Sequence, residues 1–264
     1  MRTVKATLDR ELGCVEIHTL ADWHIGDKHC DINSIKKLLQ YIHDNKNAYV
    51  ICNGDLMNNA TKASVSDCYA EDIPPMEQLE TVCELLSPIK DKILMITQGN
   101  HEARTWKQDG IDLTGLFAKQ LGIYDRYVRE GGVLFLRFGE LIGERKEHHS
   151  DKYRRVCYTI YCTHGSGGGR KEGGKINRLA ELASIVDVDC YIMSHTHSPA
   201  CIRNNYFRID LRNSSVAPVE KLFINSSARL DYGGYGETNS FKPQSKSTPI
   251  LLLDGAKKDM RVKF

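Results

Sequence analysis

Five short apolar runs recur along the first 200 residues of the chain, and a short polar motif follows each of them. The runs cover residues 15–20, 48–52, 93–97, 156–163 and 190–193. Apolar runs of this length, bounded by Gly, Asn or Asp, are typical of buried strands. Helical patterns lie between them at 32–45, 76–86 and 176–186. Strands that alternate with helices predict an α/β fold, in which ligands gather beyond the carboxyl ends of the strands.

The five polar motifs supply Asp, His and Asn side chains. They are Asp22-Trp23-His24, Gly54-Asp55, Gly99-Asn100-His101-Glu102, His164-Gly165 and Ser194-His195-Thr196-His197. Carboxylates and imidazoles suit Mn, Zn and Fe, and no thiolate occurs in the set. Two such ions, roughly 3.5–4 Å apart, clamp a phosphorus centre and deprotonate a water between them. The motifs therefore predict a hydrolytic site with two metal ions.

Each motif taken alone also has an ordinary structural explanation. Gly54-Asp55 by itself is most simply a turn, and Gly-Asn is a common turn pair, so Asn100 can be a turn residue. His195 and His197 can be partly exposed histidines at a strand end. These explanations fail jointly, because the order of the motifs and their places at strand ends would all be coincidence.

In this order the motifs resemble those of the calcineurin-like metallophosphoesterases: D-x-H, G-D, G-N-H-[DE], G-H and G-H-x-H. The resemblance covers residues 22–197. The fourth motif appears as His164-Gly165, and the fifth has Ser194 where glycine is usual, a position that is not a ligand. The resemblance implies an α/β fold of two mixed β-sheets, packed as a sandwich and flanked by helices. We expect one such domain over residues 1–264.

The resemblance also implies a role for each motif residue. Asp22, His24 and His197 would hold one metal ion, Asn100, His164 and His195 the second, and Asp55 would bridge both. His101 would lie over the site and protonate the leaving oxygen or stabilise the transition state, which suits a group that titrates near neutrality. Glu102 is expected to support the site or to start a helix. We expect two divalent ions, with Mn preferred and Zn or Fe as alternatives.

The substrate is less tightly constrained than the metal site. Residues 18–26 resemble the first motif of the Mre11 and SbcD nucleases, and Asn58-Asn59 stand where protein Ser/Thr phosphatases carry Asp-Arg. Both observations favour a phosphodiesterase that acts on nucleic acid or nucleotides through a metal-bridging hydroxide. A phosphomonoesterase acting on a small metabolite is the second interpretation. A catalytically silent binding scaffold is the third, although every expected ligand is present.

A glycine-rich segment, residues 165–175, directly follows His164. Backbone N–H groups in such a loop can approach a phosphate, and we expect Arg170, Lys171 and Lys175 to bind substrate. The alternative is a flexible surface loop with solvated charges. Arg104 and Trp106 are further candidates for the rim of the site. Residues 232–236 are expected to form a turn rather than a base-stacking platform, and His148-His149 a solvated loop.

Composition narrows the class of protein further. The 264-residue chain has a formal net charge of +2, which gives no general signature of nucleic-acid binding. Its nine cysteines are scattered and form no C-x-x-C pair, which is typical of reduced thiols in a cytoplasmic protein. No apolar run approaches the length of a membrane span, so we expect no membrane partner.

The two ends of the sequence predict hairpins. Residues 5–8 and a turn at 11–13 indicate a hairpin into the strand at 15–20. Residues 249–253 and 260–264 indicate a second hairpin, with Asp254-Gly255 as its turn signal. We expect these strands to complete a second sheet.

Overall fold

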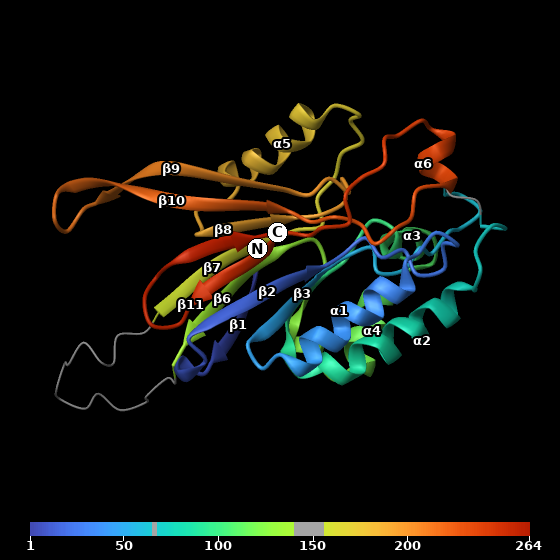
Figure 1. Cartoon of the computed structure of the whole chain (residues 1–264), viewed down its shortest axis with the longest axis horizontal. Helices are drawn as coiled ribbons and strands as arrows, with labels where there is room; N and C mark the ends of the chain where they lie inside the picture. The colour runs from blue at the N-terminus through green and yellow to red at the C-terminus, as the bar shows by residue number, and fades with distance from the viewer. Residues whose placement is uncertain (65–67, 140–155) are drawn as a thin grey trace.

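Two six-stranded sheets form the centre of the computed structural model, which describes residues 1–64, 68–139 and 156–264 (Figure 1). Sheet A has the order β1 (Arg2–Leu8), β6 (Gly132–Phe138), β7 (Val156–Cys162), β8 (Cys190–Met193), β10 (Ser215–Asn225) and β9 (Ala200–Asp210). Sheet B has the order β12 (Met260–Lys263), β11 (Ile250–Asp254), β2 (Cys14–Leu20), β3 (Ala48–Asn53), β4 (Ile93–Thr97) and β5 (Tyr127–Val128). Each sheet contains parallel and antiparallel pairs, so both are mixed, as expected.

Helices cover the outer faces of the two sheets. The helices α1 (Ile32–Asp44), α2 (Pro75–Leu86) and α4 (Leu113–Gln120) pack on sheet B, and α5 (Glu172–Glu181) packs on sheet A (Figure 1). Two further helices, α3 (Glu102–Asp109) and the short α6 (Gly234–Thr238), belong to loops at one end of the sandwich. The predicted sandwich of two mixed sheets flanked by helices is therefore confirmed.

The backbone forms four layers: the helices on sheet B, sheet B, sheet A and α5. An apolar cluster fills each of the three spaces between neighbouring layers. Val50 and Cys52 face the helices on sheet B, whereas the intervening Ile51 faces the other sheet. In sheet A, Ile192 faces the interior between the sheets and Tyr191 packs under α5. Strands that are buried on both faces read as continuous apolar runs, which explains why the sequence shows runs rather than strict alternation.

The sequence predicts two of the three expected helices to within one residue, and the third differs. The segment expected to be helical at 176–186 forms α5 from Glu172 to Glu181, followed by a 3-10 turn at Leu182–Ser184. Residues 172–175 therefore belong to a helix and not to the glycine-rich loop. Glu172 is an acidic residue in the first turn, which favours a helix start. Gly173 and Gly174 lie in the same first turn, where their low helix propensity costs least.

The predicted N-terminal hairpin is wrong. β1 pairs in parallel with β6 in sheet A, whereas β2 lies in sheet B between β3 and β11. A 3-10 turn at Arg10–Leu12 carries the chain from one sheet to the other. Val4 of β1 and Val15 of β2 therefore come from different sheets and are buried in the same apolar core between them. The apolar pattern of the two strands suits this arrangement as well as it suits a hairpin, so the sequence alone could not separate them.

The C-terminal hairpin is confirmed. β11 and β12 pair antiparallel, with Leu253 opposite Met260, and β11 joins β2 at the edge of sheet B. The side chain of Asp254 accepts the N–H groups of Ala256 and Lys257, so the turn is longer than the Asp254-Gly255 signal indicates. His148-His149 lies outside the described residues. In the part of the chain that the structure describes, no helix is both long and apolar enough to cross a membrane.

Candidate metal centre

The five motifs meet at one end of the sandwich, where strands of both sheets finish. They follow β2, β3 and β4 of sheet B and β7 and β8 of sheet A. Backbone hydrogen bonds join neighbouring loops, from Asp22 N to Gly54 O at 3.1 Å and from Ser194 N to His164 O at 3.1 Å. The carboxyl ends of parallel strands lie at the same edge of a sheet, so the chain brings motifs together that are far apart in sequence.

Asp22, His24 and His197 form a first group of possible metal ligands. One potential ligand atom from each lies within 4.8 Å of the others. The Nε2 atoms of His24 and His197 are 3.2 Å apart, and His197 Nε2 is 3.3 Å from Asp22 Oδ1. Zn–N bonds are about 2.0–2.1 Å long, so two imidazole nitrogens at this separation fit one shared ion.

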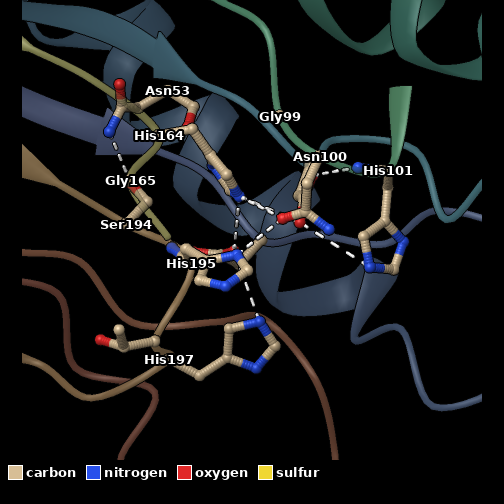
Figure 2. A network of polar contacts seen from close by, with 12 residues as sticks. Asn53, Gly99, Asn100, His101, His164, Gly165, Ser194, His195 and His197 are labelled. Atoms are coloured by element: carbon tan, nitrogen blue, oxygen red, sulfur yellow. Dashed lines mark hydrogen bonds and ion pairs between the residues drawn. The ribbon is translucent and has the colours of Figure 1, made fainter. Parts of the chain in front are cut away.

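Asp55, His164 and His195 form a second such group. His164 Nε2 is 3.1 Å from Asp55 Oδ2. The amide oxygen of Asn100 lies between the two imidazoles, 3.1 Å from His164 Nε2 and 2.6 Å from His195 Nδ1 (Figure 2). An amide oxygen and two imidazoles are acceptable donors for a divalent transition-metal ion.

Asp55 belongs to two groups at once. Besides the second group, its carboxylate lies within 4.8 Å of donor atoms of His24 and His101. One carboxylate therefore lies between the His24 side and the His164 side of the site. A carboxylate has two oxygens and one negative charge, which is what two neighbouring dications need from a shared ligand.

The donor set fits divalent ions on chemical grounds as well. Asp22 Oδ1 and His24 Nδ1 are buried and accept or donate no hydrogen bond within the described structure, an arrangement that is costly for buried polar atoms. Burial lowers the pKa of His164, but Asp55 and Asp22 outweigh it and raise this pKa to about 10. The imidazoles of His164 and His101 hold the pKa of Asp55 well below its ordinary range, although burial opposes them. The site therefore favours positive charge between these groups.

The backbone at the candidate ligands is unusual. Among the described residues, eight non-glycine residues have positive φ, and five of these are Asp22, His24, Asp55, His195 and His197. Left-handed backbone is uncommon for residues other than glycine and persists only where the surroundings impose it. The strain is concentrated at the residues whose side chains converge, which points to function rather than to stability.

Glu102 holds two of the loops in place. Its buried carboxylate accepts the N–H groups of Asp55 at 3.0 Å, Leu56 at 2.7 Å, Met57 at 3.1 Å and Gly99 at 3.1 Å. Burial and the charge of Asp55 raise the pKa of Glu102 to about 7, against these backbone donors. Glu102 was expected to support the site or to start a helix, and it does both, because it holds these loops and α3 begins at this residue.

The loops after β3 and β4 also touch each other directly. A Cβ atom placed on Gly54 would lie 2.5 Å from Gly99 Cα, and one on Gly99 would lie 2.1 Å from Asp55 N. Gly54 has a φ of 85°, in the region that favours glycine. The two glycines thus allow a backbone contact that brings Asp55 and Asn100 to the same site.

A buried polar network behind the site is not evident from the sequence. Asn53 donates to Ser194 Oγ at 2.7 Å and to Thr163 O at 2.8 Å, and its own backbone oxygen accepts from His164 Nδ1 at 2.7 Å (Figure 2). Ser226 Oγ adds a contact of 2.8 Å to Ser194 Oγ. The departure from glycine at position 194 was the available signal, since a buried hydroxyl needs partners. The hydrogen bond on Nδ1 leaves His164 Nε2 for the site.

His101 lies beside the candidate ligands. Its Nδ1 donates to Asn58 O at 2.7 Å, and its Nε2 is 3.8 Å from Asp55 Oδ2. Arg104 Nη2 donates to the same Nε2 at 3.0 Å. Burial and the Arg104 charge lower the pKa of His101, while Asp55 raises it. Figure 2 shows its ring on the far side of Asn100 from His164 and His195.

A match to a known protein family agrees with this arrangement of candidate ligands. The sequence model for calcineurin-like phosphoesterases matches residues 22–199. The chain belongs to this family. The match covers all five motifs, so the resemblance found in the sequence is confirmed at the level of the superfamily. No curated protein sequence matches the chain.

Solved structures of similar fold are distant from this metallophosphoesterase. Vps29 from Entamoeba histolytica, in complex with Zn²⁺, is 14% identical with a TM-score of 0.37, and the alignment covers 91% of this chain and 86% of that one. The Pseudomonas putida nuclease MPE is 14% identical with a TM-score of 0.35, over 94% and 87% of the chains. GAP50 of Plasmodium is 11% identical with a TM-score of 0.44, over 92% and 82%. Likenesses this low do not bear on the substrate.

The basic residues expected to bind substrate lie in the segment that follows His164. Among the described residues, no hydrogen bond or ion pair joins Arg170, Lys171 or Lys175 to a candidate ligand. Lys175 Nζ lies 3.6 Å from Glu172 Oε1, and the same carboxylate receives a hydrogen bond from Ser198, next to His197. Arg170 lies over the ring of Phe241 at 5.5 Å. Their role as substrate contacts stays a prediction.

Two other rim candidates are also placed. Trp106 is 41% exposed, and the guanidinium of Arg129 stacks on its ring at 3.8 Å from the ring centre. Trp106 is therefore neither a core residue nor a fully exposed one. The turn expected at residues 232–236 is wrong for its second half, because residues 234–236 belong to the short helix α6. Arg104, in contrast, lies in the site and contacts His101 directly.

Proposed function

We propose that this metallophosphoesterase is an active hydrolase with two divalent metal ions, and that it cleaves phosphodiesters in nucleic acid or nucleotides. The observation that supports this most strongly is the place of Asp55, whose carboxylate lies in both the His24 group and the His164 group. A scaffold without activity has no need for a carboxylate between two sets of imidazoles, because burial of such charges is costly unless they are compensated.

Each candidate ligand has a position consistent with its proposed role. Asp22, His24 and His197 would hold one ion, Asn100, His164 and His195 the other, and Asp55 would contact both. When bound, the ions bind phosphoryl oxygens and lower the pKa of a water molecule so that it can attack phosphorus. Mn²⁺ is our first choice, and Zn²⁺ or Fe would also suit the Asp, Asn and His donors.

His101 is proposed to assist departure of the alcohol, either by protonating its oxygen or by stabilising the charge that develops on it. Its ring is fixed by the hydrogen bond from Nδ1 to Asn58 O, so that Nε2 is the atom on the Asp55 side. Because Nε2 accepts from Arg104 in this structure, it would have to take up a proton before it could protonate the alcohol oxygen. A group held in one orientation beside the reacting centre loses little entropy on reaching the transition state. His101 is otherwise not needed to complete either group of ligands.

The side chains at positions 58 and 59 favour a diester over a protein phosphomonoester. Asn58 Nδ2 donates to Glu71 at 3.1 Å, and Asn59 Nδ2 donates to His101 O and Thr105 Oγ1, both at 2.8 Å. Both side chains are thus engaged in holding loops and carry no positive charge for a phosphate. Arg170, Lys171 and Lys175 are proposed to meet further phosphates of an extended substrate at the edge of the site.

The experiment that tests this function is metal-dependent cleavage of defined phosphodiesters. The Mn²⁺-loaded protein is incubated with single- and double-stranded DNA, RNA, cyclic nucleotides and bis-p-nitrophenyl phosphate, with Asp55→Asn as control. Cleavage of polymers that is absent in Asp55→Asn supports a nuclease. Cleavage of only small nucleotides would replace the nuclease with a nucleotide diesterase. A protein that binds two ions and cleaves none of these compounds, nor p-nitrophenyl phosphate, would be a scaffold.

A further inference from the structure

A cavity of about 330 Å³ lies beside the metal centre, between the ends of β7 and β8 and the helix α5, which covers sheet A (Figure 1). Cavities of roughly 300–1,000 Å³ are the size that small ligands occupy in proteins. Thr163 and Gly165 line the cavity, and in the sequence they flank the candidate ligand His164. Because consecutive Cα atoms are about 3.8 Å apart, the cavity begins one residue away from the metal centre.

Part of the cavity lining is apolar. Tyr161, Leu182 and Met193 line it, and all three are buried members of the apolar cluster that packs α5 on sheet A. Ile185 adds an exposed apolar side chain. This lining suits a ligand with a flat apolar face, such as a nucleobase, because removal of apolar surface from water favours binding.

Two opposite charges on α5 line the same cavity without pairing with each other. Arg178 and Glu181 are three residues apart, a spacing that places side chains next to each other on a helix surface. Within residues 1–64, 68–139 and 156–264, however, no ion pair or hydrogen bond joins the two side chains. The Glu181 carboxylate has no polar partner in this part of the chain. Both charged groups therefore remain available to a ligand.

The loop between β7 and α5 holds Arg178 in place and leaves one edge of its guanidinium open. Arg178 Nη1 donates to Ser166 Oγ at 3.1 Å, and a Cβ atom on Gly167 would lie 3.2 Å from Arg178 Cδ. No described residue accepts a hydrogen bond from Arg178 Nε or Nη2. These two nitrogens form a fork of parallel N–H groups, the arrangement that binds two neighbouring acceptor atoms.

The open groups of Arg178 and Glu181 complement one nucleobase on two of its edges. A guanidinium only donates and a carboxylate only accepts. Guanine presents two neighbouring acceptors, N7 and O6, which arginine binds in a bidentate manner. Guanine also presents two neighbouring donors, N1–H and N2–H, to the two oxygens of a carboxylate. Adenine, cytosine and uracil each lack at least one of these pairs.

We propose that this cavity binds a guanine base of the substrate, with Arg178 on N7 and O6 and Glu181 on N1–H and N2–H. The base would lie against the apolar lining. A nucleotide joins its base to its phosphate through a single sugar, so a base bound here would place the phosphate beyond Gly165, toward the metal centre. This inference rests on the proposed function and narrows its substrates to those that contain guanine.

The proposed contacts also select the form of the nucleic acid. Glu181 would take the N1–H and N2–H groups that guanine uses in a Watson–Crick pair, so a guanine within a duplex could not make these contacts. Recognition through this edge is typical of unpaired bases. The substrate class is therefore guanine nucleotides, or single-stranded nucleic acid that contains guanine.

The first test is binding of free nucleosides, which carry no phosphate and therefore depend neither on turnover nor on the metal ions. Calorimetry with the full chain compares guanosine, adenosine, cytidine and uridine. Guanosine should bind about 10-fold more tightly than the others, as expected for one bidentate contact to a base. Glu181→Gln replaces an acceptor with a donor and should remove this preference. Glu84→Gln on α2, which packs on the other sheet, is the matched control and should keep it.

Arg178 variants test the other edge of the base. Arg178→Ala should lower the affinity for guanosine by about 10-fold, and Arg178→Lys should recover only part of it, because an ammonium group has no planar fork. Arg178 and Glu181 are both exposed, so their variants should fold normally, with an unchanged midpoint of urea denaturation.

The second test is cleavage of single strands by the Mn²⁺-loaded protein. An oligothymidylate that contains one guanine is compared with plain oligothymidylate of the same length and with the guanine strand annealed to its complement. The single strand with guanine should be cleaved about 10-fold faster than the other two, at a phosphate next to the guanine. Glu181→Gln should cleave this strand no faster than oligothymidylate, whereas Glu84→Gln should behave as the unaltered protein.

The two tests separate this inference from the proposed function on which it rests. Equal affinities for the four nucleosides, or guanosine affinity that is unchanged in Glu181→Gln and Arg178→Ala, would overturn the guanine site even if every strand is cleaved. A preference for guanosine that disappears in Glu181→Gln would support the site. If the loaded protein then cleaves no strand, the proposed function fails, and the cavity is a guanine site without a part in hydrolysis.

Discussion

The metal-centre end of the sandwich and the β9–β10 hairpin are built by opposite means. At the metal centre, loops from both sheets are tied by side chains such as Asn53 and Glu102, and the candidate ligands Asp22, His24, Asp55 and His164 are buried. In the hairpin, strands of 11 residues pair with each other along their full length, but β8 supports only Leu222–Asn225. Phe207 is 80% exposed and Leu211 is 88% exposed.

The two regions differ in how sensitive they are to the loss of a single side chain. The hairpin is held mainly by backbone hydrogen bonds, which depend little on the identity of the side chains, and an isolated two-stranded hairpin is only marginally stable. The metal centre depends on individual polar atoms, each of which has specific partners that no other residue supplies. Substitutions should therefore have large and specific effects at the metal centre and small effects in the hairpin, and the following experiments test this contrast.

Asp55→Asn should have the largest effect. The amide has one oxygen and no charge, so it cannot serve both groups of ligands. We expect hydrolysis to fall by about 10³-fold or more, and the metal content measured by mass spectrometry to fall from two ions per chain. Retention of two ions with normal turnover would contradict the shared role of Asp55.

His101→Ala should separate chemistry from metal binding. We expect turnover to fall by about 10²-fold, within the range seen for loss of a general acid, and the metal content to stay unchanged. Normal turnover in this variant would remove His101 from the mechanism.

Glu102→Gln should loosen the loops without touching a metal ligand. The new amide group would face two N–H donors where an oxygen now accepts them, because Oε1 and Oε2 each receive two hydrogen bonds. We expect metal affinity to fall by about 10–100-fold, as for other groups that orient ligands. Glu77→Gln on α2 is a suitable control, and equal affinities in the two variants would show that the clamp is unimportant.

Ser194→Ala should affect stability more than activity. The change removes the hydroxyl that Asn53 and Ser226 contact and leaves two buried polar groups without that partner. We expect the free energy of unfolding to fall by about 1–3 kcal/mol, measured by urea denaturation. An unchanged midpoint would mean that the network relaxes around the missing oxygen.

Phe207→Ser in the hairpin should have the smallest effect. The side chain is exposed, so we expect the free energy of unfolding to change by less than about 0.5 kcal/mol, with unchanged metal content and turnover. A loss comparable to that of Ser194→Ala would show that this face of the hairpin is covered in solution and would break the contrast between the two regions.

The sequence predicts the metal centre better than it predicts the connections between strands. Motif residues and the apolar runs before them are local signals, so the positions of Asp22, Asp55 and His195 at strand ends follow from short stretches of sequence. The partner of β1 depends on residues more than 120 positions away, and nothing within residues 2–8 distinguishes β6 from β2. The β9–β10 hairpin was not predicted, because its sequence carries neither a motif nor a clear turn signal.

The sequence also reveals only part of the hydrogen bonding that supports the site. Glu102 could be assigned to a helix start from its place after His101, but its contacts with Leu56 and Met57 come from another loop. Arg104 could be named as a rim residue, yet its contact with Asn58 O depends on how α3 is oriented. Such contacts between loops are set by tertiary packing, which a single sequence does not encode in any local pattern.

The contact between Gly54 and Gly99 has a consequence for how this protein can change. Neither position has room for a side chain, since a Cβ on Gly54 would lie 2.5 Å from Gly99 Cα and a Cβ on Gly99 would lie 2.1 Å from Asp55 N. A substitution of Gly54 cannot be rescued at position 99, where no residue smaller than glycine exists, and a substitution of Gly99 meets a backbone atom that no exchange of side chain removes. Random mutagenesis under selection for folding should therefore recover variation throughout the rim, at Arg170 or Trp106 for example, while both glycines remain fixed even in a population that no longer needs the activity.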